Sequence, residues 1–410
     1  MRPKTSRRLF VAASLTLFAL PVFAGLAPKG AELRVNSRTD YKQRNPATAF
    51  STTGSALVVW ENDQKGLRAL FYGKNGQPAG AELTLIENSS TPGSERIVNR
   101  REPAIAFLSE NTVGVAWTEE TANLRVVPFL EQRDVLDRDI YFQRFNGAGV
   151  PVGERIRVNT ATAGFQSHPR LIARGGGVLV VWEDADGGIF GRWLGGPGGG
   201  QFKINEAAGA GVAIAAGTAG NNRYIAVWEG QDESETGVFA RVFDNAGNAV
   251  DSEFRVNTDT AGRQRRPAVA SDASGNFLVV WQTDLAKTES HLFAQYLGSG
   301  GNRIGGQRAL NAGAESGMVQ MAPAVVASAP GRFLVTWLAW PNNRAGLEIA
   351  GREFDAAGAA QGAVFWVSER RIERNFRRTS VSTDGKGSFL ATWETVIGRS
   401  QHIGARRLLR

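Results

Sequence analysis

The chain has 410 residues, of which 42% are hydrophobic and 21% charged, and this composition is typical of a folded globular protein rather than a disordered one. Its 49 glycines against 15 prolines indicate many tight turns, and the absence of cysteine excludes a disulfide scaffold, thiolate catalysis, Cys-ligated zinc and iron–sulfur sites. The formal charge of +8 falls to +4 without the four cations of the first eight residues, because 43 basic side chains then face 39 acidic ones, and this small excess does not indicate a nucleic-acid-binding protein.

Residues 1–24 have the pattern of an export signal. A basic start is followed by an apolar run over residues 9–23, which ends in the small-residue site Val22-Phe23-Ala24. The run is too short for a membrane span, so we expect cleavage after Ala24 and a soluble mature protein in the periplasm or outside the cell. The pair Arg7-Arg8 resembles the twin-arginine export signal, and a Sec signal with two adjacent arginines fits equally well.

A tryptophan recurs along the rest of the chain at the end of a run of β-forming residues. The seven positions are Trp60, Trp117, Trp182, Trp228, Trp281, Trp337 and Trp393. Each lies in a unit of roughly 40–55 residues with about four short strands, and such units are typical of β-propeller blades. We expect these tryptophans to pack between blades rather than to form a binding surface.

This repeat predicts an all-β fold. We expect a single domain over residues 25–410, a seven-bladed β-propeller of four-stranded antiparallel blades that start near residues 46, 103, 169, 212, 267, 323 and 379. The seventh unit stops after its third strand, near residues 403–408, whereas residues 32–36 match the outer strand of the fourth unit at residues 253–257. The N-terminal strand should therefore complete the last blade and close the ring.

The repeat contains four motifs: Q-x-x-P-A-V-A at residues 264–270, G-x-F-L-V-V-W at residues 275–281, V-F-A-R-x-F at residues 238–243 and E-F-x-V-N at residues 253–257. These motifs resemble the tandem repeats of secreted bacterial β-propeller proteins, which are mostly uncharacterised and include parts of large adhesin-like and calcium-repeat proteins. The resemblance spans about residues 31–410 and implies the propeller fold. The fourth unit departs from it, because it lacks both Gln and Pro before Val212.

Basic residues gather at the ends of the crossovers between blades. Propeller geometry places these crossovers on one face, so they should ring one mouth of the central channel. They are Arg44, Arg101, His168, Arg265, Arg266, Arg377 and Arg378. Guanidinium groups bind carboxylate, sulfate and phosphate bidentately, which predicts an acidic ligand. The alternative is pairing between blades, because Glu61, Glu183, Glu229 and Glu394 directly follow repeat tryptophans.

Trp340 differs from the repeat tryptophans because it lies outside their register, in the polar segment 337–344. We expect it to be exposed on the same face, where an indole stacks on a sugar or anchors a protein partner. A position folded over the blade edge fits the sequence equally well.

Motifs for catalysis and metal binding are weak. His168, His291 and His402 fall in different units without metal-ligand spacing, and the sequence has no nucleophile elbow or phosphate-binding loop. Asp184 and Asp186 have the D-x-D-G pattern of a calcium loop without its distal glutamate, so a solvated turn is the better interpretation.

A cluster of acids in the long insertion of the second unit leaves an enzymatic alternative. Its members are Glu119, Glu120, Glu131, Asp134, Asp137 and Asp139, and carboxylates that faced the channel would allow glycoside hydrolase or lyase chemistry. The sequence as a whole favours a monomeric binding or interaction module for an acidic glycan or an anionic surface, with no cofactor and no assigned catalytic residue. A carbohydrate-active enzyme and an envelope scaffold for other proteins remain the alternatives.

Overall fold

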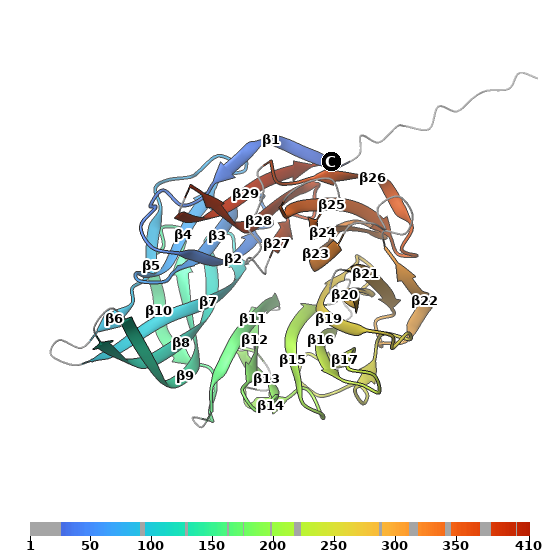
Figure 1. Cartoon of the computed structure of the whole chain (residues 1–410), viewed down its shortest axis with the longest axis horizontal. Coiled ribbons are helices and arrows are strands. Elements are labelled where there is room, and N and C mark those ends of the chain that lie inside the picture. Colours follow the sequence, from blue (N-terminus) through green and yellow to red (C-terminus); the bar gives the residue numbers. More distant parts are fainter. Residues whose placement is uncertain are drawn as a thin grey trace, which may run out of the picture.

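The computed structural model describes residues 26–90, 95–127, 130–161, 164–174, 176–196, 199–216, 223–286, 289–310, 319–340, 346–369, 379–398 and 400–410. Within these ranges the chain is all-β, and its antiparallel sheets form the ring of a β-propeller (Figure 1). The predicted export signal lies outside the described residues. In the part of the chain that is described, no helix is long and apolar enough to cross a membrane.

Each repeat runs outward from the ring axis as an antiparallel meander. The innermost strands are β2 (Gln43–Phe50), β7 (Arg96–Ser109), β11 (Gln166–Arg174), β15 (Gly209–Ala216), β19 (Arg263–Ser271), β23 (Val319–Ala329) and β27 (Thr379–Thr383). The second strands carry the repeat tryptophans and are β3 (Ala56–Asn62), β8 (Thr112–Val127), β12 (Gly177–Asp184), β16 (Arg223–Gln231), β20 (Phe277–Ala286), β24 (Arg332–Trp340) and β28 (Ser388–Ile397).

The third and outer strands complete the meanders. The third strands are β4 (Gly66–Tyr72), β9 (Leu130–Asn146), β13 (Ile189–Leu194), β17 (Thr236–Asp244), β21 (Glu289–Leu297), β25 (Glu348–Asp355) and β29 (Ser400–Leu409). The outer strands are β1 (Ala27–Arg34), β5 (Leu83–Ile86), β10 (Pro151–Arg157), β14 (Gln201–Lys203), β18 (Phe254–Arg255), β22 (Arg303–Ala309) and β26 (Ala360–Trp366). The innermost strands contact one another in chain order, and β27 contacts β2 (Figure 1).

Hydrogen bonding divides these strands into six sheets. Five have the four or five strands of a single blade, and the fifth strand of the largest of them is β6 (Ser89–Ser90), beside β7. The sixth sheet has eight strands, because Thr236 of β17 and Arg263 of β19 form one parallel bridge between two meanders. The expectation of seven separate four-stranded blades is therefore not met, since this bridge fuses two repeats into one sheet.

The N-terminal strand closes the ring, as predicted. β1 pairs antiparallel with β29, from Ala27 opposite Leu409 to Arg34 opposite Gly404, with a bulge between Lys29 and Leu33. It begins earlier than the predicted residues 32–36 and stops at Arg34. Beyond it, the N–H of Val35 donates to the carbonyl of Ile403 at 2.8 Å.

The core consists of seven hydrophobic clusters, each built from two successive repeats and each containing one repeat tryptophan. Trp281, for example, packs with Val227 and Val242 of the preceding repeat. All seven repeat tryptophans are at most 1% exposed. The prediction that they pack between blades is confirmed, and truncating one to alanine would cost about 3–5 kcal/mol.

We expect deletion of residues 25–37 to destabilise the protein and to cause aggregation. The deletion leaves the hydrogen-bonding groups of β29 unpaired, and it removes the buried Leu26 and Val35 from two clusters. Loss of these two side chains alone is worth about 3–6 kcal/mol. Urea unfolding and light scattering measure both effects. The control Lys29→Ala changes an exposed side chain of β1 and should unfold like the wild type; an unchanged midpoint for the truncated protein would contradict closure by β1.

Candidate ligand site at the channel mouth

Six innermost strands carry a β-bulge at the same place near their start. One residue of each bulge has a positive φ: Asn45 (50°), Glu102 (55°), His168 (54°), Gly211 (67°), Arg266 (52°) and Ala322 (48°). Residues other than glycine rarely adopt this left-handed conformation, which costs of order 1–3 kcal/mol. We call this set the bulge ring.

The bulges explain why the innermost strands begin earlier than the sequence predicted. Each strand pairs with its neighbour on both sides of the bulge, so β2 begins at Gln43 and β7 at Arg96 rather than near residues 46 and 103. Basic residues that we expected at the ends of crossovers, such as Arg44, Arg101 and Arg265, therefore lie within strands.

A side chain of the preceding repeat holds each bulge by accepting a backbone hydrogen bond. The bonds run from Asn45 to Glu394 (2.8 Å), Glu102 to Glu61 (3.3 Å), His168 to Glu102 (2.9 Å), Val212 to Glu183 (2.9 Å), Arg266 to Glu229 (2.7 Å) and Ala322 to Gln282 (3.0 Å), with the first residue of each pair donating its N–H. Five of these acceptors directly follow a repeat tryptophan. The post-tryptophan glutamates thus accept backbone hydrogen bonds, and nearby arginine charges act on Glu61, Glu183 and Glu229 as well.

The second repeat departs from this pattern and thereby creates a distinct charge cluster. Thr118 follows Trp117, and its hydroxyl donates to Glu102 at 2.9 Å. Glu102, itself a bulge residue, then accepts the N–H of His168 in the next repeat. A carboxylate from the bulge ring thus replaces the usual acceptor and stands beside an imidazole.

His168 lies between two carboxylates from different sheets. Its Nε2 is 3.1 Å from Oε1 of Glu102, and its Nδ1 is 3.4 Å from Oε2 of Glu183. Burial opposes protonation of the ring, but the hydrogen bonds and charges of both glutamates outweigh it and raise the pKa of His168 to about 9. The imidazole is therefore a fixed cation at neutral pH.

Neighbouring glutamates at the mouth have pKa values shifted in opposite directions. Burial raises the pKa of Glu229, against the N–H of Arg266 and the charges of Arg265 and Arg266, which lower it. Burial also opposes the ionisation of Glu183, but the hydrogen bond and charge of His168 lower its pKa below the ordinary value. One carboxyl is thus biased towards protonation and its neighbour towards ionisation.

A cavity of about 570 Å³ opens between the innermost strands β11, β15, β19, β23 and β27. Its charged lining residues are Arg170, Glu229 and Arg266, and Thr379 and Ser380 add hydroxyl groups. Proline, alanine, valine and other small or apolar residues form most of the remainder. The cavity therefore combines guanidinium donors and a carboxylate acceptor with an apolar wall, an arrangement suited to a polar ligand that carries an acidic group.

The structure brings only some of the predicted basic residues to this cavity. Arg266 lines it, whereas Arg101 pairs with Glu120 at 3.2 Å and Arg265 pairs with Asp284 at 2.7 Å. Arg44 donates from Nε to Oε1 of Gln401 at 3.4 Å. Arg377 and Arg378 lie outside the described residues. The salt bridges of Arg101 and Arg265 thus join them to acids of their own sheets, while the charges of the two arginines also oppose the rise in the pKa of Glu61 and Glu229 in the preceding repeats.

Trp340 is not in a loop as predicted, because β24 continues through it and pairs it with Val319 of β23. Its ring is partly buried against a cluster that contains Leu338 and Trp393. The pairing of β23 and β24 extends past Trp337, and this extension draws Trp340 into the sheet.

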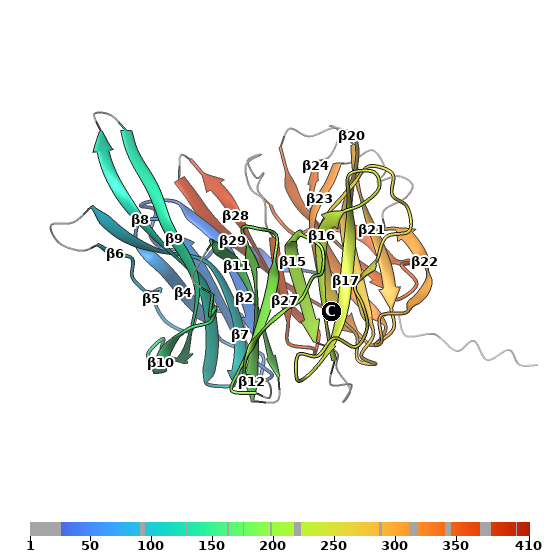
Figure 2. The ribbon, with the colours of Figure 1, turned by 90° about the horizontal axis from the view of Figure 1, so that it is seen from below.

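The acids of the second repeat's insertion lie on the β8–β9 hairpin, which projects beyond the neighbouring sheets (Figure 2). Glu119 pairs with Arg100 at 3.1 Å and with Arg155 at 2.8 Å, and Glu120 pairs with Arg138 at 2.8 Å. These two acids are therefore engaged in ion pairs rather than directed into the cavity. Among described residues, no group of three or more potential metal ligands gathers.

Asp184, in the segment with the D-x-D-G pattern, lies in a tight turn at the end of β12. Its Oδ1 accepts the N–H of Asp186 at 3.1 Å, and its Oδ2 accepts from Nε2 of Gln166 at 3.1 Å. The backbone of Gly187, with φ of 81°, donates to the carbonyl of Asp184. The carboxylate of Asp184 is thus engaged within the turn.

Sequence reasoning missed Arg170, which lines the cavity and lowers the pKa of Glu183 by its charge. It also missed the bulge ring. A signal for the ring was present, because five of its members directly precede a proline at the start of a repeat. The second signal was the glutamate or glutamine after most repeat tryptophans.

We expect Glu229→Ala to lower the free energy of unfolding by about 1–3 kcal/mol, because the N–H of Arg266 loses its acceptor. Glu229→Gln should retain most of the stability, since Gln282 already performs this role with an amide oxygen. Urea unfolding of the two variants provides the measurement. Equal loss in both variants would mean that the hydrogen bond does not hold the bulge.

Protonation of His168 should make the stability of the protein depend on pH. The pKa of about 9 in the fold exceeds the ordinary value of 6.5, so this stabilisation is complete below about pH 6.5 and is lost as the pH rises through about 9. The difference in unfolding free energy between wild type and His168→Gln should therefore shrink over that window. Urea unfolding at a series of pH values measures it, and a constant difference would show that the ring is not held as a cation.

Comparisons with known proteins place the chain by fold. No family model and no curated protein matches it. The crystal structure of a protein of unknown function from Dyadobacter fermentans is similar, with a TM-score of 0.55 and 12% identity over 95% of this chain and 100% of that one.

Two polysaccharide lyase structures are similar as well. One is a PL25 ulvan lyase bound to -[GlcA(1-4)Rha3S]-, with a TM-score of 0.50 and 10% identity over 93% of this chain and 95% of that one. The other is the polysaccharide lyase Uly1, with a TM-score of 0.50 and 9% identity over 96% of this chain and 94% of that one. At these identities, the likeness shows a shared fold alone.

Proposed function

We propose that this protein is an exported β-propeller that binds an acidic carbohydrate at the channel mouth. The observation that carries the proposal is the cavity of about 570 Å³ with Arg170, Arg266 and Glu229 in its lining. A sugar acid or sugar sulfate offers an anion to the guanidinium groups, hydroxyl groups to the carboxylate and a C–H face to the apolar wall.

The electrostatics of the mouth support an acidic ligand rather than a neutral one. His168 is held as a cation, and its charge offsets one of the two negative charges of Glu102 and Glu183. Burial favours the protonated form of Glu229, which reduces the negative charge that an anion would meet. The lyase of similar fold that was solved with a glucuronate–rhamnose sulfate saccharide supports the choice of that saccharide as a probe.

The proposal includes a ring of seven units. It is supported by the seven inter-repeat clusters and by the ring of contacts among the innermost strands. In this interpretation, the bridge between Thr236 and Arg263 joins two blades at their edges without merging their cores.

A carbohydrate-active enzyme is the second candidate, and a specific observation favours it. Glu183 and Glu229 are carboxylates from successive repeats whose pKa values are shifted in opposite directions. Such a difference suits the division of acid and base roles in the cleavage of a glycosidic bond. In this interpretation Glu229, which lines the cavity, is the candidate acid, and Glu183, which lies outside the lining and contacts Val212 and His168, is the candidate base.

Arg266→Ala and Arg170→Ala should each weaken binding of a glucuronate–rhamnose sulfate oligosaccharide by about tenfold or more, since each removes a charge-assisted hydrogen bond. Isothermal titration calorimetry measures the affinity, which should also fall with added salt. The matched control is Arg263→Ala on the same strand, because Arg263 pairs with Glu235 and does not line the cavity. Unchanged affinity in both cavity variants would overturn the proposal.

A product assay with the same oligosaccharide distinguishes binding from catalysis. Release of reducing ends or of unsaturated uronate products by the wild type, lost in Glu183→Gln and Glu229→Gln, would establish the enzyme. Saturable binding without product would establish the binding module.

A further inference from the structure

A second pocket lies in a different part of the fold, and its origin can be traced through a contact that repeats around the ring. In five places a Glu or Gln, in an outer strand or directly before it, accepts a backbone N–H from the loop that follows the outer strand of the preceding repeat. The pairs are Ser37 to Glu82 (2.8 Å), Thr160 to Gln201 (2.9 Å), Glu206 to Glu253 (2.6 Å), Thr258 to Gln307 (2.9 Å) and Glu369 to Glu32 (2.8 Å), donor first. This contact fixes which outer-strand residues are equivalent.

The residue that follows each acceptor is therefore equivalent as well. Four are apolar, namely Leu33, Leu83, Phe202 and Phe254, and the fifth is Arg308. Phe202 fills the space beneath Gly247, and Phe254 fills the space beneath Gly301, each glycine belonging to a turn of the following repeat. Arg308 lies beneath Gly358 in the same way, with its Cβ and Cγ against the glycine.

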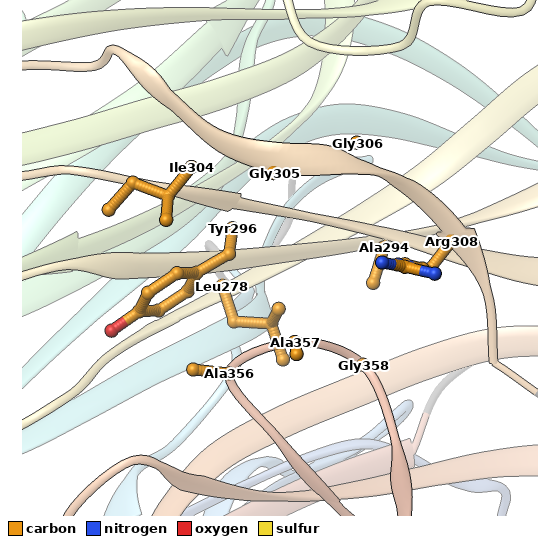
Figure 3. A pocket seen from close by; sticks show the side chains of 10 residues that line it. All are labelled: Leu278, Ala294, Tyr296, Ile304, Gly305, Gly306, Arg308, Ala356, Ala357 and Gly358. Carbon is orange, nitrogen blue, oxygen red and sulfur yellow. The ribbon is translucent and has the colours of Figure 1, made fainter.

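An arginine in place of phenylalanine leaves an apolar slot open. The structure has a cavity of about 260 Å³ here, between β20–β22 and the turn that follows β25. Figure 3 shows the guanidinium of Arg308 at one end, the ring of Tyr296 at the other and Leu278 between them. Ile304, which is 43% exposed, borders the opening.

The charge of the slot comes from Arg308, the one formally charged residue among those that line it. Among the described residues, none forms a salt bridge with this guanidinium. The hydroxyl of Tyr296 is already engaged, because it donates to Asp272 and accepts from Nδ2 of Asn276. Burial and the bond to Asp272 raise the pKa of Tyr296 to about 12, so the ring is a neutral aromatic wall.

We propose that this slot binds a small aromatic carboxylate. The aromatic ring of the ligand occupies the space that Phe202 and Phe254 fill between other repeats, and its carboxylate accepts a bidentate hydrogen bond from Arg308. The volume suits a single ring with a short acidic chain rather than an oligosaccharide. The site is separate from the channel mouth, because the two cavities share no lining residue.

Titration of the full-length mature protein with 3-phenylpropionate, followed by isothermal titration calorimetry, tests the proposal. We expect saturable binding, and we expect the alcohol 3-phenylpropan-1-ol to bind about tenfold more weakly or worse, because it lacks the anion. Equal affinity for acid and alcohol, or no saturable binding of the acid, would overturn the proposal.

Two variants at one position separate the two parts of the slot. Arg308→Gln removes the charge and should lower the affinity for the acid to that for the alcohol. Arg308→Phe fills the slot as in the other repeats, so it should abolish binding of both compounds and raise the melting temperature. The control Arg34→Gln alters an exposed arginine of β1 and should change neither affinity. Retention of acid binding by Arg308→Phe would show that the ligand lies elsewhere.

Discussion

The hydrogen bond between a left-handed backbone N–H and a side-chain oxygen of the preceding repeat is the interaction on which the ring depends. Six of the seven innermost strands bulge near their start, and a residue with a positive φ is strained there unless something holds it. A glutamate or glutamine from the neighbouring repeat does so, at distances of 2.7–3.3 Å. Because donor and acceptor belong to different repeats, this bond fixes local conformation and the packing of repeats together.

That requirement also determines the chemistry of the channel mouth. The carboxylates are there for a structural reason, and their burial raises the pKa of Glu61 and Glu229. Cations are then needed around them, and Arg101, Arg266 and His168 supply the charge. A ring of buried acids with basic neighbours therefore does not by itself indicate catalysis. The open cavity beside Arg266 and Arg170 distinguishes this part of the ring from a merely structural network.

Most of the fold could be predicted from the sequence because the responsible residues repeat. The buried tryptophans and the match between the two ends of the chain gave the meanders and the closure by β1. The bridge that fuses two repeats could not be predicted, since it rests on one residue pair between the β17 edge and β19. Trp340 was assigned to a loop because its neighbours in sequence are polar, whereas pairing with Val319 decides its position.

The site was harder to predict than the fold, because here too contacts between strands, rather than the local sequence, decide where a side chain lies. Charge counts identify arginines near the mouth, but the backbone direction at each bulge decides whether a side chain reaches the cavity, as for Arg266, or an acid of its own sheet, as for Arg265. The direction of the backbone depends on the bulge residue with a positive φ. In the sequence, only the proline that follows five of these residues marks them.

Departures from the repeat are consequently more informative than the repeat itself. Where Thr118 replaces the usual glutamate, Glu102 accepts the N–H of His168 instead. The carboxylates beside the imidazole raise its pKa, so that His168 is a cation. Where Arg308 replaces an apolar residue, packing between two repeats is incomplete and a charged slot is left. In both places a residue that would serve stability is absent, while the surrounding contacts are kept. A repeat scaffold tolerates such a change because the remaining inter-repeat clusters preserve the ring, so function can be placed at one unit without rebuilding the others.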